Sequence, residues 1–173
     1  MSRFALERHR LSSLNDLPRA EFVARLGGIY EHSPWVADRA YASRPFDSID
    51  QLHAAMQAAL MAASVEEKMA LVRAHPELLG KLEDAELTES SRREQAGAGL
   101  DRCTLGEKTR MRELNDRYRE RFGFPFIVAV KGLDWAAIIA RMEARLEHPR
   151  DAEVATALAE IGRIARLRLE ALA

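Results

Sequence analysis

The chain has 173 residues, of which 47% are hydrophobic and 31% charged, so it can bury a core and is neither disordered nor of low complexity. Its 26 basic and 27 acidic residues give a formal charge of −1, which leaves no sequence-wide attraction to nucleic acid or anionic lipid. Chains of this length commonly form one domain, so we predict a single domain over residues 1–173.

The cellular compartment is indicated by what the sequence lacks. Cys103 is the one cysteine, so the chain forms no intrachain disulfide and no thiolate metal cluster. No apolar run approaches the roughly 20 residues that span a bilayer, and charged residues interrupt the N-terminal segment where a signal peptide would be apolar. We therefore expect a cytoplasmic protein without a membrane partner.

Apolar residues recur at intervals of three and four, which predicts an all-α fold. Ser64 with Glu67, and Thr104 with Glu107, match the capping box, in which two side chains satisfy the first free N–H groups of a helix. We expect residues 1–16 to be loosely attached. Helices are predicted at 19–32, 48–62, 65–74, 90–97, 105–121, 135–147 and 151–172.

The last predicted helix has the clearest amphipathic pattern. Asp151 follows Pro149 and is the expected N-cap. Apolar residues then recur at intervals of three and four, which places them on one face of the helix: Val154, Leu158, Ile161, Ala165, Leu169 and Leu172.

Residues 124–130, FPFIVAV, form the one apolar stretch that we expect to be extended. Gly123 is expected to end the preceding helix, and Pro125 disfavours helical geometry at Phe124. The stretch is too isolated to build a sheet. Its backbone N–H and C=O groups must therefore be satisfied by a neighbouring element or by a ligand.

His75 is the first candidate for chemistry. It ends a predicted helix, and Pro76 disfavours helical geometry at the histidine itself. On position alone, the more frequent role is a histidine that interacts with the last helix carbonyls. The alternative is a general acid or base in a cleft, because histidine titrates near neutral pH.

A second polar group follows at Ser91, Glu94 and Gln95, which share a helical face. A capping box from Ser91 to Glu94 is the common interpretation of this spacing. The small residues at 96–99 weaken the helix directly afterwards and permit close approach by a ligand or a neighbouring element.

The last helix carries Arg163, Arg166 and Arg168 near its C terminus, where cations favour the helix dipole and usually face solvent. Arg168 lies between Leu167 and Leu169, and an arginine so placed can reach an anion in a cleft. The five histidines show neither an HExxH motif nor paired spacing, so we expect no metal.

Four segments occur in a fixed order: AHPELLGK, LTESSRREQAGAGL, FGFPFIVAVKG and EVATALAEIGRIARLRL. Together they resemble the family of 2-oxo-4-hydroxy-4-carboxy-5-ureidoimidazoline (OHCU) decarboxylases of urate degradation, from about Leu17 to Leu172. The resemblance implies an all-helical carboxy-lyase, usually a homodimer, that converts OHCU to (S)-allantoin with loss of CO2. It also implies that no metal or organic cofactor is used.

The resemblance further implies a set of site residues. His75 falls on the family's catalytic acid/base, and Pro76 lines the substrate. Ser91, Glu94 and Gln95 fall on a segment that is expected to hydrogen-bond the polar heterocycle and its ureido group. Backbone and apolar contacts to the substrate fall on Phe126, Ile127, Val128, Ala129 and Val130.

Two charged residues complete the implied catalytic set. The family's arginine on the last helix falls on Arg168, with Arg163 as the alternative, and we assign it to anion binding. A negative Glu94 near His75 would raise the imidazole pKa and keep it protonated.

Three rival interpretations stay open. A non-catalytic helical interaction module would scatter these residues over the surface, whereas an active site would bring them together in one pocket. A related helical enzyme could act on another small polar heterocycle, because fold alone does not fix function. A helix-turn-helix regulator is the weakest candidate, since the charge is balanced and no helix is enriched in basic residues.

Overall fold

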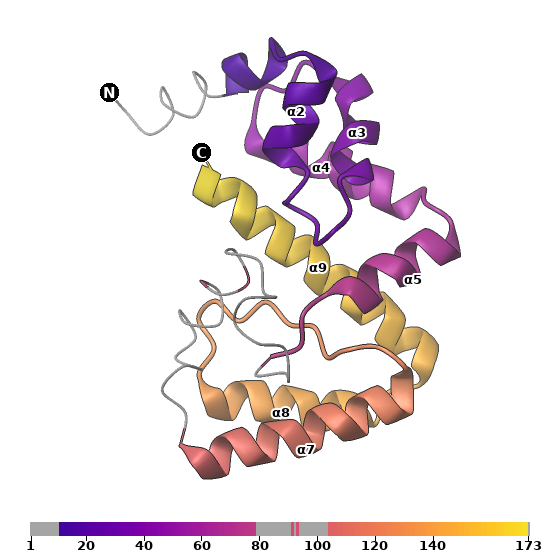
Figure 1. Cartoon of the computed structure of the whole chain (residues 1–173), viewed down its shortest axis with the longest axis vertical. Helices are drawn as coiled ribbons and strands as arrows, with labels where there is room; N and C mark the ends of the chain where they lie inside the picture. The colour runs from indigo at the N-terminus through magenta and orange to yellow at the C-terminus, as the bar shows by residue number, and fades with distance from the viewer. Residues whose placement is uncertain (1–10, 79–90, 92, 94–103, 173) are drawn as a thin grey trace. The chain divides into compact units, whose positions relative to one another are not determined.

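The computed structural model describes residues 11–78, 91, 93 and 104–172 (Figure 1). Its contacts divide the chain into two compact units: one comprises the chain up to Ala74 together with the segment from Gly162 onward, and the other runs from His75 to Ile161. The described residues form helices and connections without a β-strand. The predicted all-α fold is therefore confirmed, whereas the single domain over residues 1–173 stays a prediction.

The first unit is built from α2 (Arg19–Leu26), α3 (Trp35–Ala40), a 3-10 turn (Tyr41–Ser43), α4 (Ile49–Met61), α5 (Val65–Ala74) and the C-terminal part of α9 (Arg150–Leu172). Helix α3 packs against both α2 and α4. The largest fully buried side chains of this unit are Phe22, Leu26, Tyr30, Leu52, Met56, Leu60 and Leu71.

The described part of the N-terminal segment belongs to this unit. Leu11 is buried, and the side-chain amide of Asn15 both donates to Phe46 O and accepts from Phe46 N, each at 2.9 Å. Residues 1–10 of the segment that we expected to be loosely attached lie outside the described residues.

The predicted helix over 19–32 is wrong in its second half, because α2 ends at Leu26 and a second helix begins at Trp35. Two consecutive glycines weaken helical structure at this point. A Cβ added to Gly27 would lie 3.0 Å from Pro34 Cβ, so the chain turns back closely on itself here. Pro34, at the N-cap of α3, then starts the new helix.

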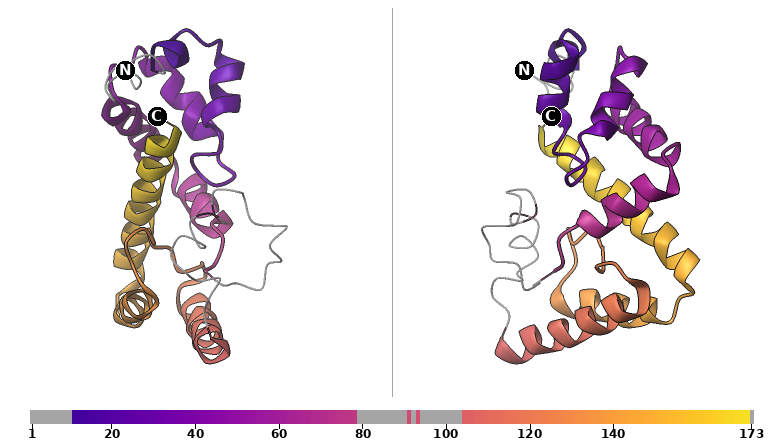
Figure 2. Two further views of the ribbon diagram at one scale, coloured as in Figure 1. Left: turned by 90° about the vertical axis from the view of Figure 1, so that its left-hand side faces the viewer. Right: turned by 45° about the vertical axis from the view of Figure 1, so that its right-hand side comes forward.

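The second unit contains α7 (Leu105–Phe122), α8 (Trp135–Leu146) and the N-terminal part of α9. Helices α7 and α8 lie side by side (Figure 2). Both helices carry buried apolar residues: Met111, Leu114, Tyr118, Phe122, Ile138, Met142 and Leu146.

Both predicted capping boxes are present. Ser64 Oγ accepts from Glu67 N at 3.2 Å while Glu67 Oε2 accepts from Ser64 N at 3.0 Å, and Thr104 with Glu107 repeats the pattern at the start of α7. Gly123 ends α7 as predicted, with φ of 77° and its N–H bonded to Arg119 O.

The expected N-cap of the last helix is wrong. Helix α9 begins at Arg150, and Pro149 O accepts the first helical hydrogen bond, from Glu153 N at 3.1 Å. Asp151 therefore lies inside the first turn, where its carboxylate favours the positive end of the helix dipole. The predicted apolar face of α9 is largely buried, although Leu172 at its end is 44% exposed.

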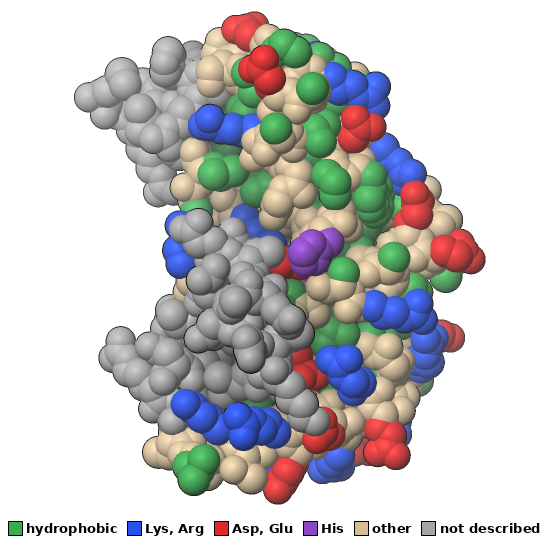
Figure 3. Space-filling model, in the orientation of Figure 1, with side chains coloured by type: hydrophobic (Ala, Val, Ile, Leu, Met, Phe, Trp, Pro, Cys, Tyr) green, Lys and Arg blue, Asp and Glu red, His purple; other side chains and the backbone are tan. Residues whose placement is uncertain are grey.

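Charged side chains of both signs are interspersed over the face drawn in Figure 3, in keeping with the formal charge of −1. Within the described part of the chain, none of the helices combines the length and the apolar character that crossing a membrane requires.

Candidate functional site

His75 is the first residue after α5, as the sequence predicts, and its side chain is half-buried. Pro76, directly after it, is buried, and so is Leu78. Asn115 on α7 donates from Nδ2 to Leu78 O at 2.7 Å. This bond fastens the segment that follows His75 to α7 within the second unit.

The Ser91 constellation is only partly described. Ser91 is helical and 3% exposed, which agrees with the helix predicted there. Glu94 and Gln95 lie outside the described residues. The roles assigned to Ser91, Glu94 and Gln95 stay predictions.

Residues 124–130 connect α7 to α8 and are neither helix nor strand. Two phenylalanines of this segment pack against Tyr118 of α7, with ring centroids 6.0 Å away for Phe124 and 5.3 Å for Phe126. Val128 is 4% exposed and Ala129 is half-buried. The segment thus runs through the interior of the second unit.

Two buried charged side chains hold the backbone of this segment. Arg145 Nη1 on α8 donates to Ile127 O at 2.6 Å, and its guanidinium carbon lies 4.5 Å from the centroid of the Phe126 ring. Glu160 Oε2 on α9 accepts from Ala129 N at 2.8 Å. Neighbouring helices therefore satisfy at least these two backbone groups, which answers in part the question that the sequence raised.

Arg145 belongs to a larger buried network. Its Nε donates to Glu153 Oε1 at 2.7 Å, the Tyr118 hydroxyl also donates to Glu153 Oε1, and His148 Nδ1 lies 2.9 Å from Glu153 Oε2. Glu153 is fully buried. Burial, followed by the bond to Glu153, raises the pKa of Tyr118 well above its usual value, so the phenol stays a donor.

Sequence reasoning missed Arg145, Glu153 and Glu160. The available signal was a charged residue on an apolar helical face: Arg145 lies three residues after the buried Met142, and Glu160 lies three residues after the buried Ala157. Such positions need a buried partner of opposite charge or a hydrogen-bonding group.

Arg168 lies in the first unit and is 7% exposed. Its Nη1 donates to Ile29 O at 3.2 Å and to Glu31 Oε2 at 3.0 Å, and Glu31 is itself 3% exposed. Arg163, the alternative, is exposed. The structure thus distinguishes the two arginines by burial, while substrate binding by Arg168 stays a prediction.

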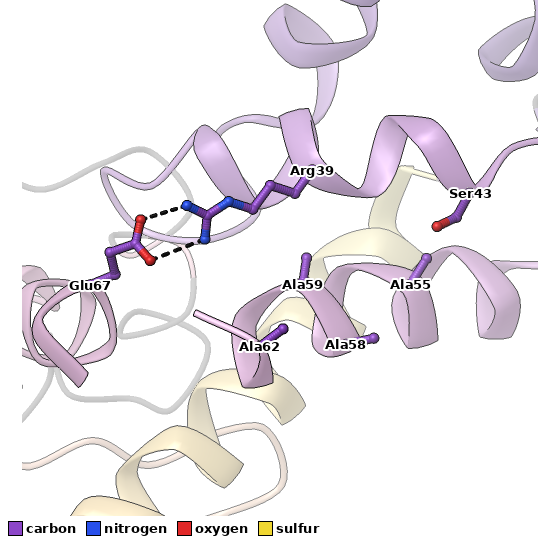
Figure 4. A pocket seen from close by; sticks show the side chains of 7 residues that line it. All are labelled: Arg39, Ser43, Ala55, Ala58, Ala59, Ala62 and Glu67. Atoms are coloured by element: carbon purple, nitrogen blue, oxygen red, sulfur yellow. Dashed lines mark hydrogen bonds and ion pairs between the residues drawn. The ribbon is translucent and has the colours of Figure 1, made fainter. Parts of the chain in front are cut away.

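A surface hollow of about 450 Å³ lies in the first unit (Figure 4). Arg39 and Glu67 form its charged side through a two-pronged ion pair of 2.6 and 3.1 Å, and small residues line the rest: Ser43, Ala55, Ala58, Ala59 and Ala62. The guanidinium carbon of Arg39 lies over the Trp35 ring, 4.6 Å from the ring centroid. None of the residues predicted for the site lines this hollow.

Comparison with known proteins tests the family directly. The chain matches the family model of OHCU decarboxylases over residues 15–170. The 2-oxo-4-hydroxy-4-carboxy-5-ureidoimidazoline decarboxylase of Haloferax volcanii is 48% identical over 159 residues, which cover 92% of this chain and 93% of that protein. The decarboxylase of the same name from Mus musculus is 36% identical over 157 residues, with coverages of 90% and 88%.

Solved structures agree. A crystal structure of (S)-allantoin synthase matches with a TM-score of 0.71 and 34% identity, covering 93% of this chain and 53% of that chain. A crystal structure of OHCU decarboxylase in the presence of (S)-allantoin matches in fold, with a TM-score of 0.66 at 21% identity and coverages of 80% and 89%. The predicted enzyme class, a carboxy-lyase, is confirmed with the family. The chain belongs to the OHCU decarboxylase family.

Proposed function

We propose that this protein decarboxylates OHCU to (S)-allantoin, with His75 as the group that transfers a proton. The observation that carries the proposal is the family match over residues 15–170. It is joined by a relative that bears the decarboxylase name and is 48% identical to this chain over nearly the whole length of both. The position of His75 supports its role, because the residue directly follows α5 and is neither fully buried nor fully exposed.

The chemistry of the substrate explains why the chain's own side chains suffice. Loss of CO2 from C4 leaves an electron pair, which forms a C4–C5 double bond while the neighbouring C=N bond places its pair on nitrogen. That nitrogen takes up a proton. The resulting enol then loses its hydroxyl proton and gains one at C5, on one face, which creates the stereocentre of allantoin. The substrate thus supplies its own electron sink.

The protein has three tasks in this reaction: to orient the breaking C–C bond, to stabilise the developing negative charge and to deliver the proton to one face. We assign proton delivery to His75, stabilisation of the anion to Arg168 and recognition of the ureido edge to Glu94 and Gln95. Ser91, Pro76 and the segment Phe126–Val130 complete the proposed binding surface.

The test follows freshly generated OHCU, made by oxidation of urate and hydrolysis in situ, by circular dichroism with and without the protein. Because OHCU also decays spontaneously to racemic product, the sign of the signal is as informative as its rate. Rapid formation of one allantoin enantiomer supports the proposal. Slow racemic decay that the protein leaves unchanged rejects it.

The same assay separates the proposal from an enzyme of this fold that acts on another heterocycle. If OHCU is unchanged, parallel incubation with other small cyclic ureides, followed by mass spectrometry, identifies that activity. A non-catalytic interaction module would change none of them.

We also propose that the enzyme works as a cytoplasmic homodimer, as the family resemblance implies. The single cysteine supports a reducing compartment, because the chain needs no intrachain disulfide. Sedimentation equilibrium tests the assembly: a mass near twice 19.5 kDa supports the dimer, and 19.5 kDa contradicts it.

A further inference from the structure

We propose that Arg145 and Glu160 are positioning residues, which hold the backbone of Phe126–Val130 in the orientation that binds substrate. The inference rests on the proposed function, since it takes this segment to contact OHCU. It concerns two side chains that neither the sequence motifs nor the family resemblance assigned to the site.

The two hydrogen bonds fall on the peptide groups at either side of one residue, Val128. Arg145 Nη1 binds Ile127 O at 2.6 Å, and Glu160 Oε2 binds Ala129 N at 2.8 Å. A trans peptide group is planar, with its C=O and N–H pointing in opposite directions. Arg145 therefore sets the direction of the Val128 N–H, and Glu160 sets the direction of the Val128 C=O.

Val128 therefore offers one hydrogen-bond donor and one acceptor, as an amide group does. The Val128 N–H points away from Arg145, and the Val128 C=O points away from Glu160, so the segment directs one donor and one acceptor away from the two charged side chains. A ureido group carries the complementary acceptor and donors. The geometry thus suits recognition of a flat, amide-like edge of a small molecule.

Packing alone does not set the directions of the Val128 N–H and C=O groups. The rings of Phe124 and Phe126 anchor the start of the segment against Tyr118, but this ring packing does not set the rotation of the peptide groups on either side of Val128, which follow the two rings. Residues 124–130 belong to no helix or strand that would set it. The two charged side chains, from α8 and α9, supply the missing constraint.

Stability gives a poor account of these charges. Arg145 is 7% exposed, Glu160 5% and Glu153 fully buried. Replacing a buried ion pair, such as that of Arg145 with Glu153, by apolar residues of similar volume is often neutral or stabilising. The contribution of Arg145 and Glu160 therefore lies in the geometry that they impose on the backbone.

The test compares KM and kcat for OHCU among variants of the full chain. Glu160→Leu removes the acceptor of the Ala129 N–H, whereas Glu160→Gln keeps an oxygen that can accept it. Arg145→Lys keeps the positive charge opposite Glu153 but loses the planar fork that reaches both Glu153 and Ile127 O. Tyr118→Phe is the matched control, because it removes the hydrogen bond to Glu153 and the 3.5 Å bond from Arg145 Nη2 but leaves both bonds to the backbone in place.

We expect Glu160→Leu and Arg145→Lys to raise KM by roughly 5- to 30-fold, which is the effect of losing one or two hydrogen bonds, with a smaller change in kcat. Glu160→Gln should stay within about 3-fold of wild type. Tyr118→Phe should lower the melting temperature without a change in KM. Amide hydrogen exchange, read by NMR, should be faster at Ala129 in Glu160→Leu than in Glu160→Gln.

The outcomes are distinct. If the wild-type protein does not accelerate OHCU turnover, the proposed function fails and this inference fails with it. If the wild type is active and both Glu160→Leu and Arg145→Lys keep its KM, only the positioning role is rejected. The same holds if Tyr118→Phe raises KM as much as they do, since that result would show a general loosening of the network. Should Glu160→Leu not fold, Arg145→Lys against Tyr118→Phe decides.

Discussion

Arg168 and Glu31 are separated by 137 residues in sequence, yet they form an ion pair of 3.0 Å in which both side chains are almost fully buried. An arginine that the sequence marks as a substrate ligand is therefore also half of an internal ion pair. The ion pair contributes to the stability of the fold, whereas substrate binding contributes to activity. Variants can therefore separate the two roles.

Removal of either partner alone should be costly. We expect Glu31→Met or Arg168→Met to lower the free energy of unfolding by about 3–5 kcal/mol, because each removes the ion-pair partner of a buried charge. The double variant should lose much less than the sum of the two, which a double-mutant cycle by urea denaturation measures. If Arg168 binds substrate, the double variant recovers stability and stays inactive on OHCU. Recovery of both would contradict the substrate role.

His75→Ala should lower kcat for OHCU by about 10²- to 10⁴-fold, the usual contribution of a general acid or base. The product should lose its single handedness, because spontaneous decay then dominates; circular dichroism of the allantoin signal reports both effects. His53→Ala is the control, since that ring bonds Gly162 O at 2.9 Å and has no proposed part in the chemistry. A near-wild-type rate in His75→Ala would refute the assignment.

Acid should weaken the first unit through its surface ion pairs. Hydrogen bonding from Arg39, and then from Ser64 N, holds the pKa of Glu67 below its ordinary 4.5, and hydrogen bonding from Arg19 holds the pKa of Asp38 below 3.8. A lowered folded-state pKa stabilises the protein above the unfolded value, and this stability is lost as pH falls through the folded value.

Through these two pairs, the melting temperature should therefore depend little on pH above about pH 5, where both pairs contribute in full, and should fall below about pH 4. Glu67→Gln should make that fall shallower. Glu120→Gln, at an exposed position on α7, serves as the comparison. An identical acid limb in wild type and Glu67→Gln would show that the Arg39 pair contributes nothing measurable.

The capping box of α7 should be measurable in isolation. Thr104→Ala removes the acceptor of the Glu107 N–H, and we expect it to cost about 1 kcal/mol of unfolding free energy. Thr109→Ala lies one turn further on and loses only a bond to Leu105 O within the helix, so it should be nearly neutral. Equal losses in both variants would argue against the cap.

Two helical glycines should respond oppositely to alanine. Gly106 has open space around an added Cβ, so Gly106→Ala should stabilise α7 by up to about 1 kcal/mol. At Gly162 the new Cβ would lie 2.9 Å from Gln57 Oε1, which accepts a hydrogen bond from Tyr30. Gly162→Ala should therefore destabilise, and adding Gln57→Ala should relieve the clash. Thermal unfolding of the three variants checks this.

Local chemistry was predictable from the sequence where the interacting groups are close along the chain. Ser64 and Glu67 are three residues apart, and Gly123 ends its helix by its own conformational freedom, so both could be identified without knowledge of the fold. Asp151 was misplaced because Pro149, with no side-chain cap to offer, provides the first helical carbonyl instead.

Only the part of the candidate site that lies in sequence motifs was predictable. His75 lies where the sequence places it, but Glu31 is 137 residues away from its partner Arg168, and Glu153 lies on a different helix from its partner Arg145. A pattern of apolar spacing does not say which buried charge meets which, because that depends on the packing of separate helices. The roles of Glu94 and Gln95 rest on the family resemblance.

The bonds that hold Ile127 and Ala129 end on backbone atoms, so they do not depend on the identity of the side chains at these positions. Apolar side chains of similar size can therefore replace one another at residues 127–129 while the peptide groups keep their direction. In this segment the path of the main chain is therefore set separately from the identity of the side chains that it carries. If the segment binds substrate as proposed, variation at these side chains is the first route to a changed substrate preference in this scaffold.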